Sequence, residues 1–388
     1  MEFGWTSEQE SIRQEMRKLA SRFDDDYWLE KDRSHTFPEE FYQAVAKGGW
    51  LGIAMPEEYG GAGMGISEAA IIVHEAAASG GCMQAASSIH MNIFGVNPLV
   101  VFGTDEQKRR HLPDIIQGKT KVAFGVTEPD VGLDTTRIKT RAVKEGSNYR
   151  INGRKVWIST AQVASKLLLL TRTTPIEEVE RPAEGLTLFF TELNRDAIDV
   201  REIDKCGRGG VDSNELFIDD LIVPETDVVG EVGKGFYHIL HGLNPERILT
   251  AAEASGIGRV ALERATRYAK ERVVFGRPIG QNQAVQHPLA RCWMDLEAAQ
   301  LLQYKAAWLY DNGHPCGAEA NSAKYLASEA GYRAADQAMQ TLGGMGYAKE
   351  YHVERYWRES KMIRIAPVSP ELIHCYIAER VLGLPKSY

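Results

Sequence analysis

The 388-residue sequence contains no run of about 18 consecutive apolar residues, which a membrane-spanning helix would need. We therefore expect no transmembrane helix. The sequence also lacks a surplus of positive charge, because 45 Lys and Arg residues stand against 53 Asp and Glu residues, a formal net charge of -8. Nucleic-acid binding needs a basic face, so it is not expected. Gly and Pro, with 36 and 15 residues, are too few for a collagen-like or disordered chain.

Cysteine is scarce, and its pattern does not suggest pairing. The cysteines are odd in number, far apart and form no C-x-x-C motif: Cys82, Cys206, Cys292, Cys316 and Cys375. This pattern favours free thiols in a reducing compartment over a disulfide framework. The amino terminus, Met1–Trp5, has neither a signal-peptide core nor an Arg-rich transit pattern. We expect a soluble cytoplasmic protein, or a mature form that has lost a presequence.

Several catalytic motifs are missing as well. The sequence has no G-x-S-x-G elbow, so a hydrolase nucleophile is not expected. Its ten histidines form no H-E-x-x-H motif and no cluster with cysteine at zinc spacing, so no metal site is predicted. Five of these histidines are interpreted as capped, exposed or core residues: His90, His111, His241, His287 and His352.

Two nucleotide-binding motifs are matched only by letter. Residues 256–261 read G-I-G-R-V-A, but the preceding residues 248–255 are alanine-rich and helix-like, whereas a dinucleotide turn follows a strand. We therefore interpret these small residues as a close helix contact. Gly118-Lys119-Thr120 resembles the end of a P-loop, but Pro113 occupies the required upstream glycine position, so no phosphate cradle is expected there.

The length predicts two or three domains, and the hydrophobic period changes twice along the chain. Residues 1–120 have helical periodicity. Ser7 and Glu10 fit a capping box with Ser7 as the N-cap, and a second helix is expected after Pro38. Two or three further apolar helices should run to Gly118.

Residues 121–230 alternate with a period of two, which is typical of strands. Val122, Phe124 and Val126 alternate with small residues. Asn152-Gly153 lies between two such stretches and predicts a hairpin with a type I′ turn. Further strands are expected at 167–170, 186–190 and 216–223. From 231 to 388 helical spacing returns, with helix ends expected near 311–315 and 343–346.

Four separated segments together resemble the acyl-CoA dehydrogenase family. They are A-F-G-V-T-E-P at 123–129, N-G-R-K-V-W-I-S at 152–159, E-R-V-V-F-G-R-P-I at 271–279 and Q-T-L-G-G-M-G-Y at 340–347. The resemblance implies an α+β fold of three domains. These are an N-terminal helical domain (1–120), a central β-barrel-like domain (121–230) and a C-terminal four-helix-bundle domain (231–388).

The resemblance also implies FAD, bound without a Rossmann fold. It places the isoalloxazine against Phe124, Val126 and Thr127, with Trp157 and Ser159 covering its other side. Arg272, Phe275 and Gln283 would meet the pyrophosphate and adenine region of an FAD held by a neighbouring subunit. Gln340, Gly343 and Gly344 would contact the adenosine part, and Ser369 would lie near the flavin.

The implied reaction is α,β-dehydrogenation of an acyl-CoA thioester to the trans-2-enoyl-CoA. A base removes the α-proton while the β-hydride passes to flavin N5. Many family members carry this base as a glutamate near the carboxyl terminus, where this sequence has Pro367. A minority, including isovaleryl-CoA and long-chain dehydrogenases, place it on a helix just before an arginine. Glu246-Arg247 is similar to that arrangement, so Glu246 is the candidate base.

Other positions bear on the substrate. Tyr237, Asn244 and Arg247 match acyl-CoA contacts of the family, whereas Leu133 stands where many relatives have a serine that contacts CoA. In relatives the backbone N–H at the position of Pro367 holds the thioester carbonyl, and proline has none. Either a neighbouring amide of 366–369 serves instead, or the oxyanion site is altered.

The resemblance implies a homotetramer, a dimer of dimers, that passes electrons to an electron-transfer flavoprotein. Three alternatives stay open: an acyl-CoA oxidase, a desulfinase-like member of the family, and a flavin- or acyl-CoA-binding protein without dehydrogenase activity.

Overall fold

The computed structural model describes residues 4–387, so Met1–Phe3 of the amino-terminal segment lie outside the described residues. The helices are α1 (Ser7–Ala20), α2 (Asp25–Ser34), α3 (Glu39–Lys47), α4 (Ile66–Ala76), α5 (Cys82–His90), α6 (Asn97–Phe102), α7 (Asp105–Ile116), α8 (Gly235–Glu271), α9 (Gln283–Asp311), α10 (Gly317–Leu342), α11 (Val353–Ile365) and α12 (Pro370–Tyr376). The strands are β1 (Val122–Gly125), β2 (Arg141–Glu145), β3 (Asn148–Ser159), β4 (Lys166–Arg172), β5 (Leu186–Glu192), β6 (Ile198–Glu202), β7 (Ser213–Pro224), β8 (Val273–Val274) and β9 (Arg277–Pro278).

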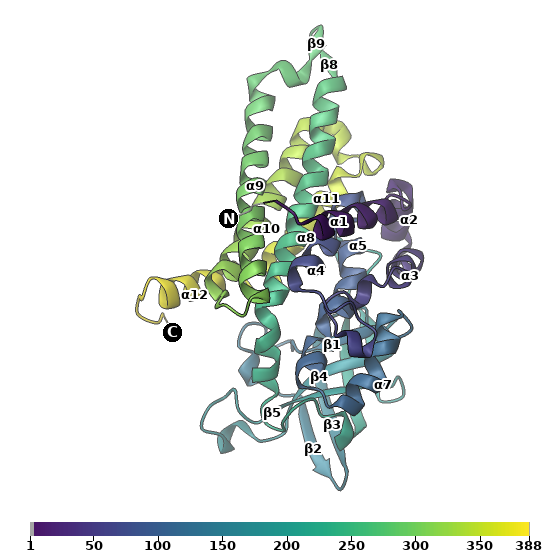
Figure 1. Cartoon of the computed structure of the whole chain (residues 1–388), viewed down its shortest axis with the longest axis vertical. Helices are drawn as coiled ribbons and strands as arrows, with labels where there is room; N and C mark the ends of the chain where they lie inside the picture. Colours follow the sequence, from purple (N-terminus) through teal and green to yellow (C-terminus); the bar gives the residue numbers. More distant parts are fainter. Residues whose placement is uncertain (1–3, 388) are drawn as a thin grey trace.

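The predicted α+β fold class is confirmed: helices come first, a curled sheet follows, and a helical bundle ends the chain (Figure 1). The long helices α8 and α9 run along the longest axis of the molecule. The small β8–β9 hairpin lies at one end of this axis and the large sheet at the other (Figure 1). Because α8 also packs against α4, one helix joins the first and last parts of the chain.

The first helix begins where the sequence predicts, but its cap differs. Thr6, rather than Ser7, is the N-cap, and its hydroxyl accepts from the Gln9 amide at 3.1 Å while the Gln9 side chain accepts from the Thr6 amide at 3.2 Å. Thr-x-x-Gln satisfies the same capping-box rule one position earlier, so the local pattern alone did not decide between the two. Helix α2, capped by Asp24, was not predicted.

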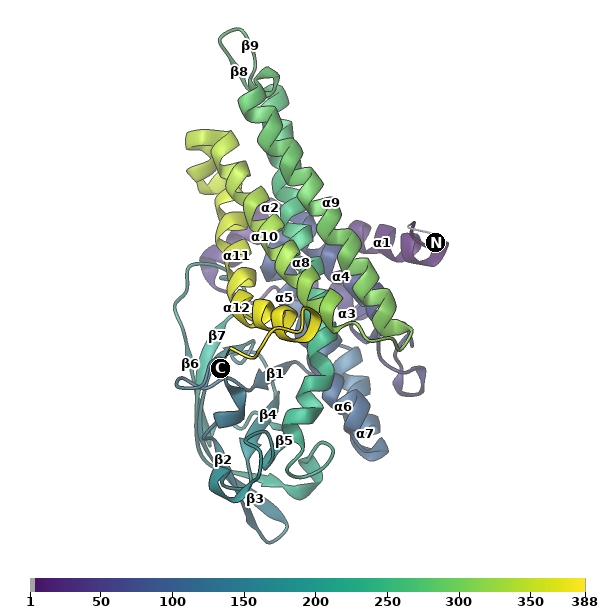
Figure 2. The same cartoon turned by 90° about the vertical axis from the view of Figure 1, so that its left-hand side faces the viewer.

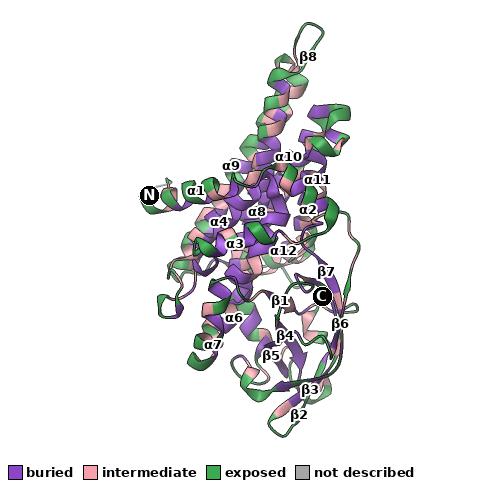
Figure 3. Cartoon of the chain, turned by 90° about the vertical axis from the view of Figure 1, so that its right-hand side faces the viewer, coloured by how far each residue is buried: buried purple, intermediate pink, exposed green. Residues whose placement is uncertain are grey.

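Helices α4 to α6 form the centre of the first part. One helical run, Ile66–Phe102, is long and apolar enough by composition to cross a membrane, and 61% of its most apolar window is buried inside the structure. The run is interrupted at Gly80, which has φ +97°. Figure 3 shows the buried residues concentrated where α4 and α8 meet.

The sheet has seven strands in the order β1-β4-β2-β3-β7-β6, with β5 paired to β4. Most pairs are antiparallel, whereas β1 runs parallel to β4 from Val122 opposite Lys166 to Gly125 opposite Leu169. The strands predicted at 167–170, 186–190 and 216–223 correspond to β4, β5 and β7. Two apolar clusters line its faces, one under α7 and one between β3, β5 and β7.

The hairpin prediction at Asn152-Gly153 is wrong. These residues lie inside the continuous strand β3, and the chain reverses instead between Glu145 and Asn148, which pair directly. Contacts distant in sequence explain both residues: the Asn152 side chain bonds Asp220 on β7, and a Cβ on Gly153 would lie 2.4 Å from Thr140. A register shift between β3 and β7 accompanies them.

The carboxyl-terminal part is a bundle of α8, α9, α10 and α11, with α12 crossing beside it (Figure 2). The interpretation of 256–261 as a close helix contact is confirmed. A Cβ on Gly256 would lie 2.5 Å from the His74 carbonyl oxygen, and one on Gly258 would lie 2.5 Å from Leu296. The glycines therefore let α8 approach α4, α9 and α10 closely.

Candidate functional site

A pocket opens where α8, the segment after α5 and strand β1 meet. Ten residues line it, and eight of them are apolar or glycine: Met91, Phe94, Gly95, Pro98, Phe124, Ile239, Gly242 and Leu243. The other two, Glu246 and His90, are titratable. A mostly apolar pocket with few polar groups is typical of a small-molecule site, so Glu246 and His90 are its candidate reactive groups.

The Glu246 side chain faces this pocket without a hydrogen-bond partner among the described residues. Burial raises the pKa of its carboxyl group, although His90 and Arg247 act to lower it. Pro245 precedes it inside α8 and has no N–H to donate to the helix. A half-buried carboxylate with a raised pKa and free lone pairs is suited to accept a proton.

Arg247 and Asn244 lie beside Glu246 on α8. The Arg247 Nη1 donates to the Asn244 Oδ1 at 3.0 Å, while its Nε is buried without a partner. Tyr237, two turns earlier, is 38% exposed, and Leu133 is 62% exposed on a loop after β1. The structure thus brings Asn244 and Arg247 together with Glu246.

Strands β1 and β3 present the residues predicted to meet the isoalloxazine. The Val156 N–H donates to the Thr127 carbonyl at 2.9 Å, so the segment after β1 runs beside β3. Between Lys155 and Ile158 strand β3 bulges, and Trp157 adopts φ +62° and is 59% exposed. Bulges redirect a side chain, and this one turns the Trp157 indole outward.

An internal ion pair fixes this arrangement. The Lys155 Nζ donates to the Glu128 Oε1 at 2.9 Å and to the Val126 carbonyl at 3.0 Å. Glu128 also accepts from the backbone amides of Lys139 and Thr140, at 2.6 and 2.9 Å. Glu128 and Lys155 belong to two of the four segments singled out in the sequence, and their contacts hold those segments together.

Sequence reasoning missed Arg208, which lies beside Ser159. Its Nη2 donates to the Ser159 Oγ at 3.0 Å and to the Ser213 Oγ at 2.6 Å, and its Nη1 donates to the Ser87 Oγ at 3.4 Å. Arginine has no acceptor, so the Ser159 oxygen must accept and its hydroxyl proton stays available. A single arginine in a Gly-rich loop carries no local signal of this role.

The residues present at this surface fit a flavin. The outward-facing Trp157 indole on β3 and the Phe124 ring on β1 offer flat aromatic surface, and Thr127 and Ser159 on the same two segments add hydroxyl groups. The chemistry of this set, with aromatic faces and hydroxyls beside an apolar pocket, suits a planar heteroaromatic ring.

The other predicted FAD contacts lie elsewhere on the chain. Arg272, Phe275 and Gln283 are at the β8–β9 end of α8 and α9, and Phe275 is fully exposed. Arg272 is 26 residues after Glu246, about 40 Å along the helix. Gln340, Gly343 and Gly344 are exposed at the end of α10, and a Cβ on either glycine would meet nothing. One chain does not bring these groups together with Trp157.

The segment 366–369 follows α11. Ser369 is the N-cap of α12, and its Oγ accepts from the Leu372 amide at 3.3 Å. The Lys324 Nζ, fully buried on α10, donates to the Val368 carbonyl at 2.7 Å. Pro367 is exposed and supplies no N–H. The contact with Lys324 therefore fixes this segment against α10.

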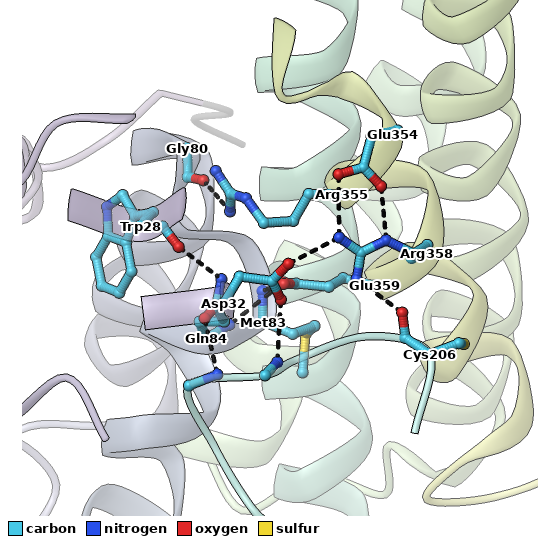
Figure 4. A network of polar contacts seen from close by, with 12 residues as sticks. Trp28, Asp32, Gly80, Met83, Gln84, Cys206, Glu354, Arg355, Arg358 and Glu359 are labelled. Carbon is cyan, nitrogen blue, oxygen red and sulfur yellow. Dashed lines mark hydrogen bonds and ion pairs between the residues drawn. The ribbon is translucent and has the colours of Figure 1, made fainter. Parts of the chain in front are cut away.

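Helix α11 is itself fixed by a polar network (Figure 4). The Arg358 guanidinium contacts Glu354 on its own helix and the Asp32 Oδ2 on α2 at 2.8 Å, and donates to the Cys206 carbonyl at 2.7 Å. The Glu359 Oε2 accepts from the Met83 amide at 2.6 Å. These contacts join α11 to α2, α5 and the loop that carries Arg208.

The sequence also gave no functional role to His90, which the structure places on the wall of the pocket. Its Nδ1 lies 2.7 Å from the Glu253 Oε1, and Glu253 is only 2% exposed. Glu253 is seven residues after Glu246 and therefore lies on the same face of α8. The i, i+7 spacing of two glutamates is common in exposed helices, so it was not a distinguishing signal.

Three family models match the chain. They are described as the N-terminal, middle and C-terminal domains of acyl-CoA dehydrogenase, and they match residues 6–119, 123–221 and 233–382.

Two curated relatives and one solved structure illustrate the similarity. "Acyl-CoA dehydrogenase FadE12" of Mycobacterium tuberculosis (strain ATCC 25618 / H37Rv) is 38% identical over 388 residues, covering 99% of this chain and 98% of the relative. "Caffeyl-CoA reductase-Etf complex subunit CarC" of Acetobacterium woodii is 34% identical over 356 residues, covering 90% of this chain and 93% of the relative. The structure of butyryl-CoA dehydrogenase from Megasphaera elsdenii has a TM-score of 0.90 at 31% identity, covering 98% of this chain and 100% of that one.

Proposed function

The chain belongs to the acyl-CoA dehydrogenase family, and on this basis we propose that it dehydrogenates an acyl-CoA thioester to the trans-2-enoyl-CoA with Glu246 as the base. It is an oxidoreductase that uses FAD. The observation that carries the proposal is the Glu246 carboxylate, which has no hydrogen-bond partner in the described part of the chain and faces an apolar pocket that Phe124 also lines.

Glu246 would accept the α-proton of the bound thioester. An α-proton is weakly acidic, so a base with a raised pKa held next to it is what the step requires. The apolar wall of Phe94, Ile239 and Leu243 would exclude water from the carboxylate and surround the acyl chain. FAD, when bound, supplies the acceptor for the hydride that leaves the β-carbon.

The thioester oxygen needs a hydrogen-bond donor as negative charge develops on it. Pro367 cannot donate, so we infer that the Val368 N–H serves. No described group accepts from this N–H, and the Val368 carbonyl is anchored by Lys324. Arg247 and Asn244 would contact the acyl-CoA near the pocket mouth, with Tyr237 and Leu133 further out.

Exposed apolar groups support a homotetramer. Met294, Leu301 and Trp308 recur every seven residues along α9 and are 57%, 49% and 56% exposed. A seven-residue apolar repeat on an unpaired helix face is typical of a helix that packs on another helix. Phe275 is fully exposed at the β8–β9 turn. We propose that a neighbouring subunit covers these groups and that its FAD meets Arg272, Phe275 and Gln283.

We propose an electron-transfer flavoprotein as the electron acceptor, because one relative is named as a subunit of an Etf complex. All five cysteines are free thiols, which supports a reducing, cytoplasmic setting. The name of that relative also makes reduction of an enoyl-CoA a second candidate, since Glu246 could return a proton to the α-carbon in the reverse direction.

An anaerobic panel of straight, branched and aryl acyl-CoA esters tests the proposal. A saturated acyl-CoA should bleach the yellow protein, and added electron-transfer flavoprotein should restore its colour. If no acyl-CoA bleaches the FAD-loaded protein, the dehydrogenase proposal fails. Rapid reoxidation by oxygen alone would instead identify an oxidase, and turnover only with reduced flavoprotein and an enoyl-CoA would identify a reductase.

A further inference from the structure

The pocket contains a second polar group that the proposed reaction does not use. Among its ten lining residues only His90 and Glu246 carry polar side chains, and the base role occupies Glu246 alone. The His90 side chain is 13% exposed. Its ring packs edge-to-face with the Phe94 ring, with 6.4 Å between the ring centroids. It therefore faces the acyl end of the site from a fixed position.

Glu253 determines which atom of His90 faces the pocket. The Glu253 carboxylate can only accept, so the Nδ1 atom 2.7 Å away carries a proton. This contact turns Nδ1 away from the ligand space and leaves Nε2 as the second polar atom of the ring. Among the described residues none hydrogen-bonds Nε2. A polar atom in an apolar wall without a protein partner loses its hydrogen bond to water when an apolar chain covers it.

The charge of the His90 ring limits which ligand groups can form a hydrogen bond with it. Burial lowers the pKa of His90, but the Glu253 carboxylate and its hydrogen bond, with a smaller contribution from Glu246, outweigh burial and raise it. Charged His90 presents Nε2–H as a donor, and neutral His90 with Nδ1–H presents Nε2 as an acceptor. A hydroxyl group both donates and accepts, so it pairs with either form. A carboxylate would be repelled by Glu246 and Glu253, which flank His90.

We propose that His90, held by Glu253, is a specificity residue that hydrogen-bonds a hydroxyl group on the acyl chain beyond the β-carbon, so that the substrates are hydroxylated acyl-CoA thioesters. This inference rests on the proposed function for the position of the thioester. It adds a substrate class that the choice of base does not determine. Glu246 would act on the α-carbon while His90 holds the far end of the same chain.

Measuring how acyl-CoA esters bind to the FAD-loaded Glu246→Gln variant tests the proposed hydroxyl contact without turnover. Calorimetry would compare pairs of equal size: 5-hydroxypentanoyl-CoA with hexanoyl-CoA, and 3-(4-hydroxyphenyl)propanoyl-CoA with its 4-methyl counterpart. We expect the hydroxyl member of at least one pair to bind about 10-fold or more tightly, because the apolar member leaves the buried His90 Nε2 without a hydrogen bond. Equal affinities in both pairs would overturn the inference while leaving the dehydrogenase proposal intact.

Substitution of His90 identifies the source of any preference. His90→Phe in the Glu246→Gln background should abolish or reverse it, and Glu253→Gln should retain part of it because the amide oxygen still accepts from Nδ1. His314→Gln, on an exposed histidine after α9, is the matched control. If His90→Phe does not retain FAD, His90→Leu, which also lacks a hydrogen-bonding group, replaces it. A preference that survives loss of His90 would overturn the inference, and absence of binding by every acyl-CoA would overturn both proposals.

Discussion

The Nζ atom of Lys155 lies 2.9 Å from the Oε1 atom of Glu128, and the two side chains are 0% and 5% exposed. Burial lowers the pKa of Lys155 to about 8, although Glu128 acts to raise it. Burial alone would raise the pKa of Glu128, but Lys155 and the backbone amide of Lys139 lower it. The pair thus stays ionised at neutral pH and joins the segment after β1, which carries Thr127, to strand β3, which carries Trp157.

Removal of either partner should destabilise the sheet by about 3–5 kcal/mol, because it leaves the other charge buried alone. Glu128→Ala should cost more than Lys155→Met, since it also removes the acceptor for the Lys139 and Thr140 amides. Urea unfolding of the FAD-loaded protein measures both. Asp130→Asn, in a solvent-exposed pair with Lys139, is the control and should cost less than about 1 kcal/mol. Equal losses in all three variants would contradict the structural role of the pair.

Glu246→Gln should lower kcat/KM for the best acyl-CoA by about 10²–10⁴ while FAD absorbance and acyl-CoA affinity stay near wild type. The proton acceptor is lost but the size of the side chain is kept. Glu263→Gln, exposed on the same helix, is the control. Because burial raises the pKa of Glu246, kcat/KM of the wild type should rise with pH and level off at a higher pH than for a solvent-exposed glutamate. Near-normal turnover by Glu246→Gln would reject the base.

The fold class could be predicted from periodicity and four short segments because each reports a local constraint. Alternation from Val122 and the helical spacing after 231 persist over many residues, so tertiary contacts do not override them. The hairpin prediction at Asn152-Gly153 failed because it depended on a signal only two residues long. The glycine is needed for approach to Thr140 and the asparagine for its contact with Asp220, which only the sheet register creates.

The residues of the candidate site likewise divide into those that the sequence predicted and those that it missed. Glu246 could be found from its neighbour Arg247, since the two residues form a recognisable sequence pair. His90, Glu253 and Arg208 could not, because they come from different elements and meet only after folding. Trp157 and Phe275 lie on different elements, on β3 and at the β8–β9 turn, so no single sequence window contains both, and the proposed site shared between subunits rests on the family resemblance.

Gly256→Ala tests the reading of the G-x-G-x-x-A match as a helix contact. The added Cβ would lie 2.5 Å from the His74 carbonyl, so α8 and α4 must separate, at a cost of about 1–3 kcal/mol. Thermal unfolding should show the loss while the dissociation constant of FAD stays unchanged. Arg267→Ala, exposed on the same helix, should leave both unchanged. Weakened FAD binding without loss of stability would instead indicate a nucleotide-contacting turn.

Glu359 should make stability fall as pH rises. Its carboxyl group is 1% exposed, and burial raises its pKa to about 7, although Arg355 acts to lower it (Figure 4). The folded state therefore holds the proton more tightly than the unfolded state, in which the pKa is near 4.5. Its contribution is complete below about pH 4.5 and is lost as pH rises through 7, up to about 3 kcal/mol.

Glu359→Gln removes this dependence because the amide is neutral at every pH and its oxygen can still accept from the Met83 amide. The free energy of unfolding should then decline less between pH 5 and 7.5 than in the wild type. His111 contributes the opposite slope, since burial lowers its pKa to about 4, but it is common to both proteins and cancels in the difference. Glu350→Gln, on an exposed glutamate before α11, should keep the wild-type slope. Parallel pH profiles for wild type and Glu359→Gln would mean that Glu359 is ionised in the folded protein, with Arg355 compensating its burial.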